Sequence, residues 1–235
     1  MKYLKIIAVL LLIAVCTFLS CEVEGEIQQS RSKKTTAVVI TIHSHPAEVT
    51  QVTAGSISAS LSVSASATPS ETLIYQWYSN TSNRNSGGTE ISGATSAVFA
   101  IPKTLTAGTY YYYCIVQDAG GTVAERSNVA TVTVYALPAL TTLAVTAFDN
   151  ATATLGGNVS NAGTPAYIER GVCYSTTRNP TTANHQTPVA GAGTGNFTTG
   201  VSGLTPNTTY YVRAYAISAA GTAYGNEVSF RYVNE

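Results

Sequence analysis

The fold is decided by residues 56–67, whose sequence is SISASLSVSASA. Apolar residues alternate with Ser along this whole stretch, and they are Ile57, Ala59, Leu61, Val63 and Ala65. A period of two places these side chains on one face of a β-strand and the serines on the other. The sequence therefore predicts a strand with one buried face and one hydroxylated face.

Short segments of the same kind flank this strand and are separated by turn residues. They are residues 37–42, 73–78, 98–101, 108–117 and 122–134, the last two joined as a hairpin around 118–121. Short strands at this spacing are typical of an all-β sandwich. The composition agrees, because only 10% of residues are charged, against about 25% in an average domain. The abundance of Ser, Thr, Ala, Gly and Val favours strands over helices.

Residues 37–136 resemble an immunoglobulin-like domain of the bacterial extracellular kind. The resemblance lies in Tyr75-Gln-Trp77-Tyr, Ile91-Ser-Gly-Ala-Thr and Leu105-x-x-Gly108-Thr-Tyr110-x-Tyr112-x-Cys114. It implies that Trp77 is the core tryptophan and that Tyr112 is the tyrosine corner. The sequence departs from the family because Leu61 or Val63 stands where the partner cysteine would be. We therefore expect Cys114 to be a buried free thiol that packs as a small hydrophobic residue.

Ala136-Leu-Pro138 marks the boundary to a second unit, residues 137–235, whose end repeats that of the first. The stretch 204–210 echoes 105–110, and the Gly-Thr pair at 221 follows the one at 121 by one hundred residues. Similar hairpins at this period indicate two tandem units of one architecture.

The second unit resembles a fibronectin type III domain through Leu204-x-Pro206-x-Thr208-x-Tyr210-x-Val212-x-Ala214. Glu169-Arg-Gly171-Val-Cys-Tyr174 resembles the variant found in cell-envelope lipoproteins of Bacteroidota. On the predicted strand 168–175, Val172 and Tyr174 share one face and Cys173 points to the other, so we expect Cys173 to be the less buried thiol. The predicted fold class is all-β, with two tandem sandwiches of the immunoglobulin-like and fibronectin type III-like kinds.

Residues 1–20 have the organisation of a signal peptide. Lys2 and Lys5 precede the apolar stretch Ile6–Leu19, which has fourteen residues, whereas a membrane-spanning helix needs about 20. The end of the stretch, Phe18-Leu19-Ser20-Cys21, resembles a bacterial lipobox, although Leu stands one place late. The resemblance implies cleavage after Ser20 and attachment of palmitate-like acyl chains at Cys21. The alternative is an ordinary secreted protein.

The stretch 21–36 has no apolar periodicity and is predicted to be a flexible tether. Glu22, Glu24 and Glu26 directly after the cysteine resemble the surface-export signal of Bacteroidota lipoproteins, or else simply solvate the tether. The expected location is the cell envelope, lipid-anchored to a membrane such as the outer membrane, at its surface or periplasmic face.

Residues that could carry catalysis or bind a metal are sparse in the sequence. His43 and His45 share a strand face as metal ligands could, but Glu48 is the only further ligand nearby, and zinc needs about four. Cys114 and Cys173 lack a neighbouring histidine that would activate a thiol, although Arg170 is near Cys173. His185 is expected to be solvated in a polar loop. We therefore expect no enzyme, no metal and no cofactor.

The charge balance argues against a nucleic-acid partner. Without Lys2 and Lys5 the chain has ten basic and twelve acidic side chains, a balance of −2. No basic stripe is available to neutralise phosphates. The expected partners are a membrane, through the lipid at Cys21, and a glycan or an envelope protein.

Tyrosine is the remaining signal, with fifteen in the chain. Alternation along the predicted strands points five of them outward, as possible ligand contacts: Tyr78, Tyr111, Tyr113, Tyr211 and Tyr215. Exposed aromatic rings can stack on sugars or anchor a protein, but tyrosines also fill sheet surfaces because they favour strands. The loops 79–90 and 179–197 are rich in polar residues of the kind found in binding loops.

These features lead to two functional hypotheses. The first is a lipoprotein that uses its sandwiches for adhesion or binding without bond chemistry. The second is a structural spacer that supports another envelope component.

Overall fold

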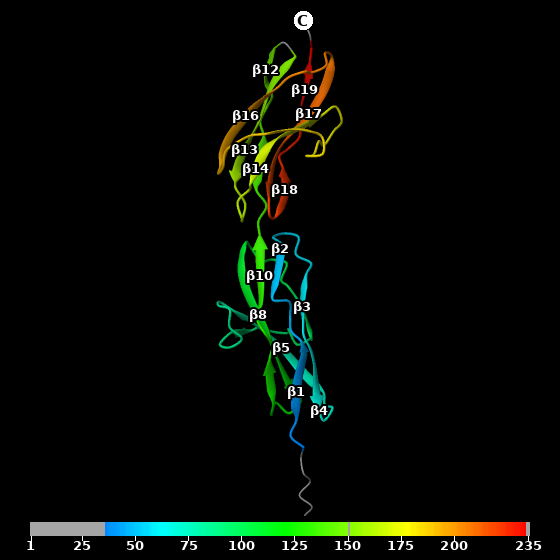
Figure 1. Ribbon diagram of the computed structural model, residues 1–235, viewed down its shortest axis with the longest axis vertical. Coiled ribbons are helices and arrows are strands. Elements are labelled where there is room, and N and C mark those ends of the chain that lie inside the picture. Colours follow the sequence, from blue (N-terminus) through cyan, green and yellow to red (C-terminus); the bar gives the residue numbers. More distant parts are fainter. Residues whose placement is uncertain (1–35, 150, 234–235) are drawn as a thin grey trace, which may run out of the picture. The chain divides into compact units, whose positions relative to one another are not determined.

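The computed structural model describes residues 36–149 and 151–233 (Figure 1), and all regular elements in these ranges are β-strands. The predicted signal peptide, the acylation site Cys21 and the tether up to residue 35 lie outside the described residues. Within the described part of the chain, no helix has the length and apolar character that crossing a membrane would require.

The first sandwich, β1–β10, has one large sheet with the order β2-β10-β8-β5-β6, in which β9 also pairs with β8. The small sheets β1-β4 and β3-β7 contribute to the same core. The strands are β1 Val39–Ser44, β2 Val49–Thr53, β3 Ser60–Ser62, β4 Ser64–Thr68, β5 Leu73–Asn80, β6 Thr89–Glu90, β7 Val98–Ala100, β8 Gly108–Asp118, β9 Ala124–Arg126 and β10 Ala130–Tyr135.

The alternating stretch 56–67 buries its apolar residues as predicted, but it does not form one strand. Ile57, Leu61 and Val63 are buried, whereas β3 pairs with β7 and β4 pairs with β1. The chain therefore changes its pairing partner at Val63, whose N–H bonds to Ala97 O at 2.9 Å. A sequence period reports which side chains face the core and does not report which neighbour supplies the hydrogen bonds.

Two further expectations for strands need correction. β2 was not predicted, and it pairs in parallel with β10. The predicted strand 122–134 is divided into β9 and β10 at residues 127–129. Here the Ser127 hydroxyl accepts the N–H of Cys114 and donates to Asn128 O, so a side chain replaces one of the regular backbone hydrogen bonds between the strands.

The first core is built around Trp77, which is fully buried. Its ring stacks on Phe99 with centroids 5.5 Å apart, and its Nε1 donates to Ser96 O at 2.9 Å. Cys114 is also fully buried and free. The predictions for Trp77 and Cys114 are therefore confirmed.

The prediction that Tyr112 forms the tyrosine corner is wrong. Tyr110 makes the hydrogen bond back to the preceding loop, from its OH to Thr106 O at 3.0 Å. Tyr112 instead packs against Phe99 with centroids 5.2 Å apart. In the second sandwich Tyr210 also bonds to the loop before its strand, but as the acceptor, because the N–H of Thr205 donates to Tyr210 OH at 3.0 Å. Tyr110 and Tyr210 therefore hold corresponding loops in their two sandwiches.

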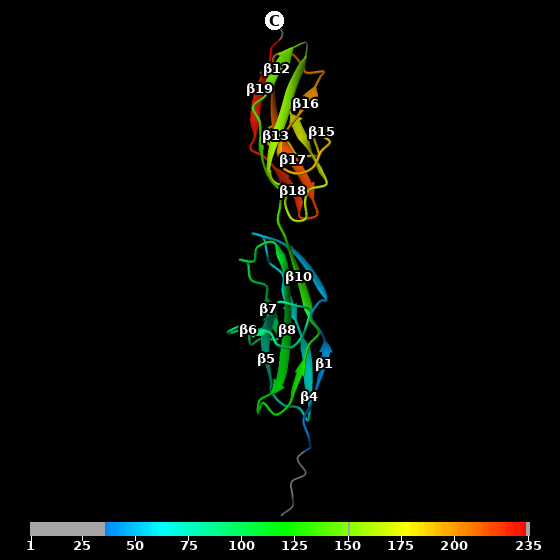
Figure 2. The same cartoon turned by 90° about the vertical axis from the view of Figure 1, so that its left-hand side faces the viewer.

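The second sandwich, β11–β19, packs two sheets together (Figures 1 and 2). One has the order β11-β13-β12 with β16 on β13, and the other has the order β15-β14-β17-β18 with β19 on β17. The strands are β11 Ala139–Thr142, β12 Thr146–Asp149, β13 Thr152–Asn161, β14 Glu169–Ser175, β15 His185–Pro188, β16 Gly195–Val201, β17 Thr208–Ser218, β18 Gly221–Tyr224 and β19 Val228–Tyr232.

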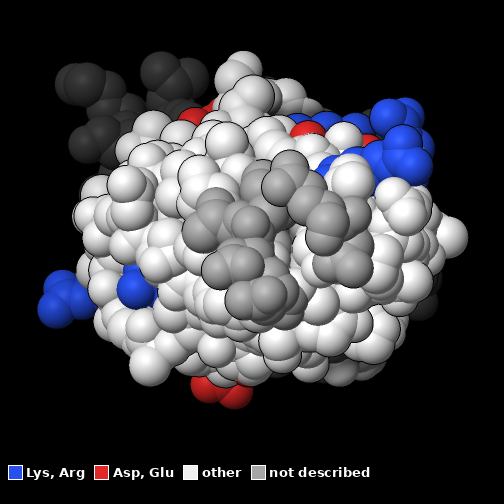
Figure 3. Space-filling view, turned by 90° about the horizontal axis from the view of Figure 1, so that it is seen from above, with Lys and Arg blue, Asp and Glu red and all other residues white. Residues whose placement is uncertain are grey.

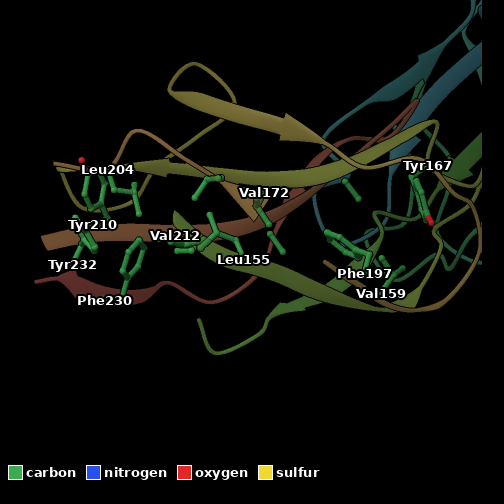
Figure 4. Close-up of a cluster of buried hydrophobic side chains, with 14 residues drawn as sticks. Leu155, Val159, Tyr167, Val172, Phe197, Leu204, Tyr210, Val212, Phe230 and Tyr232 are labelled. Carbon is green, nitrogen blue, oxygen red and sulfur yellow. The ribbon is translucent and has the colours of Figure 1, made fainter. Parts of the chain in front are cut away.

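Figure 4 shows the core between these sheets, where Leu155 and Phe197 face Val172 and Val212. Cys173 was expected to be the less buried thiol, and this prediction is wrong because both thiols have no exposed surface. Cys173 does lie on the face away from the core, but there it is flanked by Arg213 and Gln186 on the neighbouring strands.

Candidate functional site

The outer face of the large first sheet carries a stacked tyrosine pair. Tyr78 on β5 lies directly opposite Tyr113 on β8, with ring centroids 5.2 Å apart and planes 11° apart. Tyr78 is half-buried. Partial burial and the nearby Glu90 carboxylate raise its pKa, because both disfavour the phenolate.

Tyr113 was predicted to point outward as a ligand contact, and it is instead only 2% exposed. Alternation assigned it to the correct face, but the loop between β5 and β6 covers it. The N–H of Gly88 donates to Tyr113 OH at 3.3 Å, and a Cβ at Gly88 would lie 2.9 Å from Tyr113 Cε1. The loop backbone therefore lies directly on the ring, and Tyr113 supports the loop instead of touching a ligand.

This covering loop is folded around Asn80, the last residue of β5. The Asn80 amide donates to Arg84 O at 2.8 Å and to Ser86 O at 3.0 Å. Its Oδ1 accepts the N–H of Thr81 at 2.8 Å. Further along, the amide of Asn85 donates to Ser127 O at 3.0 Å and ties the loop to the segment between β9 and β10. Side-chain bonds to loop backbone of this kind hold polar groups in place before a ligand arrives.

Between the tied loop and the segment before β2 lies a depression of about 580 Å³, which we call the loop hollow. It is lined by Pro46, Glu48, Asn83, Arg84, Asn85, Ser86, Asn128 and Val129. The lining offers a carboxylate, a guanidinium, three amides and a hydroxyl, which can donate and accept hydrogen bonds. Such a surface can hold a polar ligand in a defined orientation.

Tyr111 is half-buried and belongs to the outer face beside this loop. The strand register places it between Asn80, which holds the loop, and Thr131, whose N–H bonds to Glu48 O at 2.8 Å. Of the two predicted tyrosines on β8, Tyr111 is thus the one that keeps accessible surface.

The two histidines that precede Pro46 in the sequence form separate hydrogen bonds. His43 Nε2 is 2.7 Å from Ser66 Oγ, and His45 Nδ1 accepts the N–H of Asn128 at 3.1 Å. Over residues 36–149 and 151–233, no three His, Cys, Asp or Glu side chains gather as a metal site would require. His45 positions one wall of the hollow.

The outer face of the second sandwich is occupied by arginine–tyrosine pairs. The guanidinium carbon of Arg178 lies 5.4 Å from the centre of the Tyr211 ring, and Arg178 also pairs with Glu227 at 3.6 Å. Arg213 lies 4.6 Å from the centre of the Tyr224 ring. Tyr211 therefore keeps some accessible surface, but one face of its ring is already taken.

Tyr215 was also predicted to point outward, and this is wrong because it has no exposed surface. It lies opposite Gly171 on β14, and a Cβ at Gly171 would come within 2.9 Å of the Tyr215 OH. That OH donates to Glu169 Oε1 at 2.7 Å. Burial, followed by the bond to the Glu169 carboxylate, raises the Tyr215 pKa. The missing side chain at Gly171 was the one sequence signal of this burial.

Neither buried cysteine has the environment of a nucleophile. Burial raises the pKa of the Cys114 thiol and of the Cys173 thiol to about 11 each, which disfavours the thiolate. Arg170, the basic neighbour noted in the sequence, lies over the Phe197 ring at 4.9 Å and so belongs to the core side. The charge that does act on Cys173 comes from Arg213.

A second depression of about 460 Å³, which we call the end hollow, lies on the second sandwich. It is lined by Ser175, Thr176, Ala183, Asn184, His185 and Tyr210. His185 is exposed as expected, but it begins β15 and stacks on Tyr174 with centroids 5.3 Å apart. No pattern in the sequence predicts that these residues lie together.

Charge is sparse on the face shown in Figure 3, where Lys, Arg, Asp and Glu occupy small, separate parts of the surface. That view offers no continuous basic stripe of the kind that binds phosphates.

The fold defines a class: this is an all-β protein of two tandem sandwiches of the immunoglobulin-like and fibronectin type III-like kinds. Residues 31–136 match the family model of a domain of unknown function, DUF8696. No curated protein matches the sequence.

Solved structures of similar fold come from multidomain proteins. They include immunoglobulin domains 1–5 of Sidekick-1 (19% identity, covering 87% of this chain and 41% of that chain, TM-score 0.46). They also include the insect immune protein hemolin (17%, 86% and 49%, TM-score 0.47) and domains FN1–FN3 of chicken CNTN1 (11%, 81% and 65%, TM-score 0.39). This chain spans less than two thirds of each of them, and at these identities the likeness concerns the fold alone.

Proposed function

We propose that this chain is a lipid-anchored, extracytoplasmic binding module that holds a polar ligand, a glycan or an envelope protein, without bond chemistry. The observation that carries the proposal is the loop hollow, where polar side chains stand on a loop tied down by Asn80 and Asn85. A loop already fixed in place loses little conformational entropy on binding.

The proposed location comes from the sequence. The leader 1–20 would be removed and Cys21 acylated, which would leave the sandwiches outside the cytoplasm on the tether. Each buried CH₂ of an acyl chain contributes about 0.8 kcal/mol, so two or more chains give a firm anchor where one is marginal. A binding module held at a membrane surface gains effective concentration toward ligands on that surface.

Binding is favoured over catalysis because the candidate nucleophiles are poorly placed. Cys114 and Cys173 are inaccessible and protonated at neutral pH. The loop hollow offers Glu48 and Arg84, which can hold charges or hydroxyls of a ligand. We therefore assign ligand contacts to Asn83, Arg84 and, at the neighbouring strand, Tyr111.

The test is a binding screen of the purified chain against glycans and envelope proteins, followed by variants. Arg84→Ala should weaken binding of any hit about 10- to 100-fold, since a hydrogen bond to a charged group contributes about 1.5–3 kcal/mol. Arg231→Ala removes an exposed arginine from β19 and serves as the matched control. Binding that is equally insensitive to Arg84→Ala and to the control would refute the assignment.

One observation favours the spacer hypothesis. Tyr113 and Tyr215 are buried within the fold, so fewer aromatic rings are exposed to contact a ligand. A spacer would support assembly of its envelope component even when Asn83, Arg84 and Tyr111 are all replaced by Ala. Loss of assembly in that triple variant would instead favour the binding function.

A further inference from the structure

The end hollow of the second sandwich has three neighbouring strands as its walls. β14 pairs with β15 on one side and with β17 on the other, so Tyr174 lies between His185 and Val212. The lining residues come from the end of β14, from the start of β15 and the turn before it, and from Tyr210 on β17. Figure 4 shows Tyr210 at one end of the core, beside Leu204 and Tyr232.

The base of this hollow is a row of aromatic rings that reaches from the core to solvent. Phe230 stacks on Tyr210 at 5.6 Å, Tyr210 meets Tyr174 edge-on at 6.3 Å, and Tyr174 stacks on His185 at 5.3 Å. Tyr210 is buried and His185 is exposed. The imidazole therefore presents a free ring face outward while Tyr174 holds its other face in place.

The rim of the end hollow keeps hydrogen-bonding capacity that the fold does not use. Among the described residues, no group hydrogen-bonds to the ring nitrogens of His185. Asn184 Oδ1 accepts the N–H of Thr181 at 2.9 Å, which fixes the amide and leaves its NH₂ free for a ligand. Thr176 adds an exposed hydroxyl. Together they supply both donors and acceptors around the exposed face of the His185 ring.

No charged side chain lines the end hollow, in contrast to the loop hollow with Glu48 and Arg84. The complementary ligand is thus neutral, with one apolar face and hydroxyl groups around its edge. We propose that the end hollow binds a neutral sugar ring, whose C–H face packs on His185 and whose hydroxyls bond to Asn184 and Thr176. This site is separate from the loop hollow and does not depend on the function proposed for it.

The test is an NMR titration of the purified chain with neutral monosaccharides and short neutral oligosaccharides, with glucuronic acid as a charged comparison. Resonances of Asn184, His185 and Tyr210 should shift, with a Kd on the order of millimolar, as expected for a shallow site with few contacts. His185→Ala should weaken binding at least about 10-fold, while His185→Phe, which keeps the stacking face, should weaken it less. His43→Ala, an exposed histidine of the first sandwich, should leave the Kd unchanged.

Several results would overturn the proposal. They are shifts confined to Asn83–Ser86, no shifts with any saccharide, equal binding of glucuronic acid, or binding that His185→Ala leaves unchanged in a variant with a native-like spectrum. Shifts confined to Asn83–Ser86 would support the loop hollow while excluding the end hollow. A sugar that shifts only the end hollow would support the end hollow, while the loop hollow is decided by its own binding screen, so the two proposals fail separately.

Discussion

Replacing Tyr113 by Ala should destabilise the first sandwich strongly, although the residue lies on the outer face of its sheet. The ring is 2% exposed, stacks on Tyr78 and lies beneath Gly88. Truncation of a buried aromatic side chain costs about 3–5 kcal/mol. The loop can settle partly into the space, so we expect about 3 kcal/mol.

Two variants separate the parts of this effect. Tyr113→Phe removes only the long hydrogen bond to Gly88, which contributes about 0.5–1 kcal/mol. Tyr111→Ala removes a half-buried tyrosine from the same face two residues away, and about 1 kcal/mol is expected for the smaller area returned to water. The order of stability should therefore be wild type, Tyr113→Phe, Tyr111→Ala and, last, Tyr113→Ala.

Urea unfolding followed by tryptophan fluorescence measures this order selectively. The chain has a single tryptophan, Trp77, at the centre of the first core. With a slope of about 1.5 kcal/mol per molar urea, the midpoint of Tyr113→Ala should fall by about 2 M. A midpoint for Tyr113→Ala no lower than that for Tyr111→Ala would show that the loop does not cover the ring and would refute the reasoning.

Three further predictions concern two kinds of buried group and the loop over the first sheet. Tyr215→Phe leaves the Glu169 carboxylate without its donor and should cost the second sandwich about 1–2 kcal/mol; an unchanged calorimetric transition would contradict this. Cys114 and Cys173 hold their protons more tightly when folded, with pKa about 11 against an ordinary 9. The contribution of each thiol to the free energy of unfolding is therefore fully present below pH 9. Between pH 9 and pH 11 the free energy of unfolding should fall by about 1.4 kcal/mol per pH unit for each thiol. In urea titrations with a reducing agent, each Cys→Ala variant should lack the part of this pH dependence that its thiol causes. Asn80→Ala frees the loop over the sheet and should speed amide hydrogen exchange at Arg84–Ser86, whereas unchanged protection would mean that Asn80 does not hold it.

The face of a side chain could be read from the sequence, because strand alternation depends only on neighbouring residues. The apolar residues of 56–67, Trp77 and Cys114 all lie where the pattern places them. Strand boundaries were harder to predict, since they depend on pairing partners far away in the chain. The parallel strand β2 shows this, because Val49–Thr53 needs the distant β10 to complete its hydrogen bonds.

Exposure on the outer faces could not be read from alternation. Tyr113 and Tyr215 are covered by groups from elsewhere in the chain, and only Gly88 and Gly171 hint at the close approach. The choice between Tyr110 and Tyr112 as the corner tyrosine likewise depends on where the loop backbone lies. The candidate hollows depend on loops that meet across the fold, and no spacing in the sequence encodes them.

The central proposal, a binding module anchored outside the cytoplasm, is tested most directly at Cys21. The measurement is the intact mass and N-terminal sequence of the chain extracted from membranes after labelling with a palmitate analogue. Cys21→Ser is compared with Cys16→Ser, which removes a cysteine of the leader instead. The proposal predicts that wild type and Cys16→Ser give a labelled chain that begins at residue 21, and that Cys21→Ser does not. An unlabelled chain, or one that begins elsewhere, would contradict it.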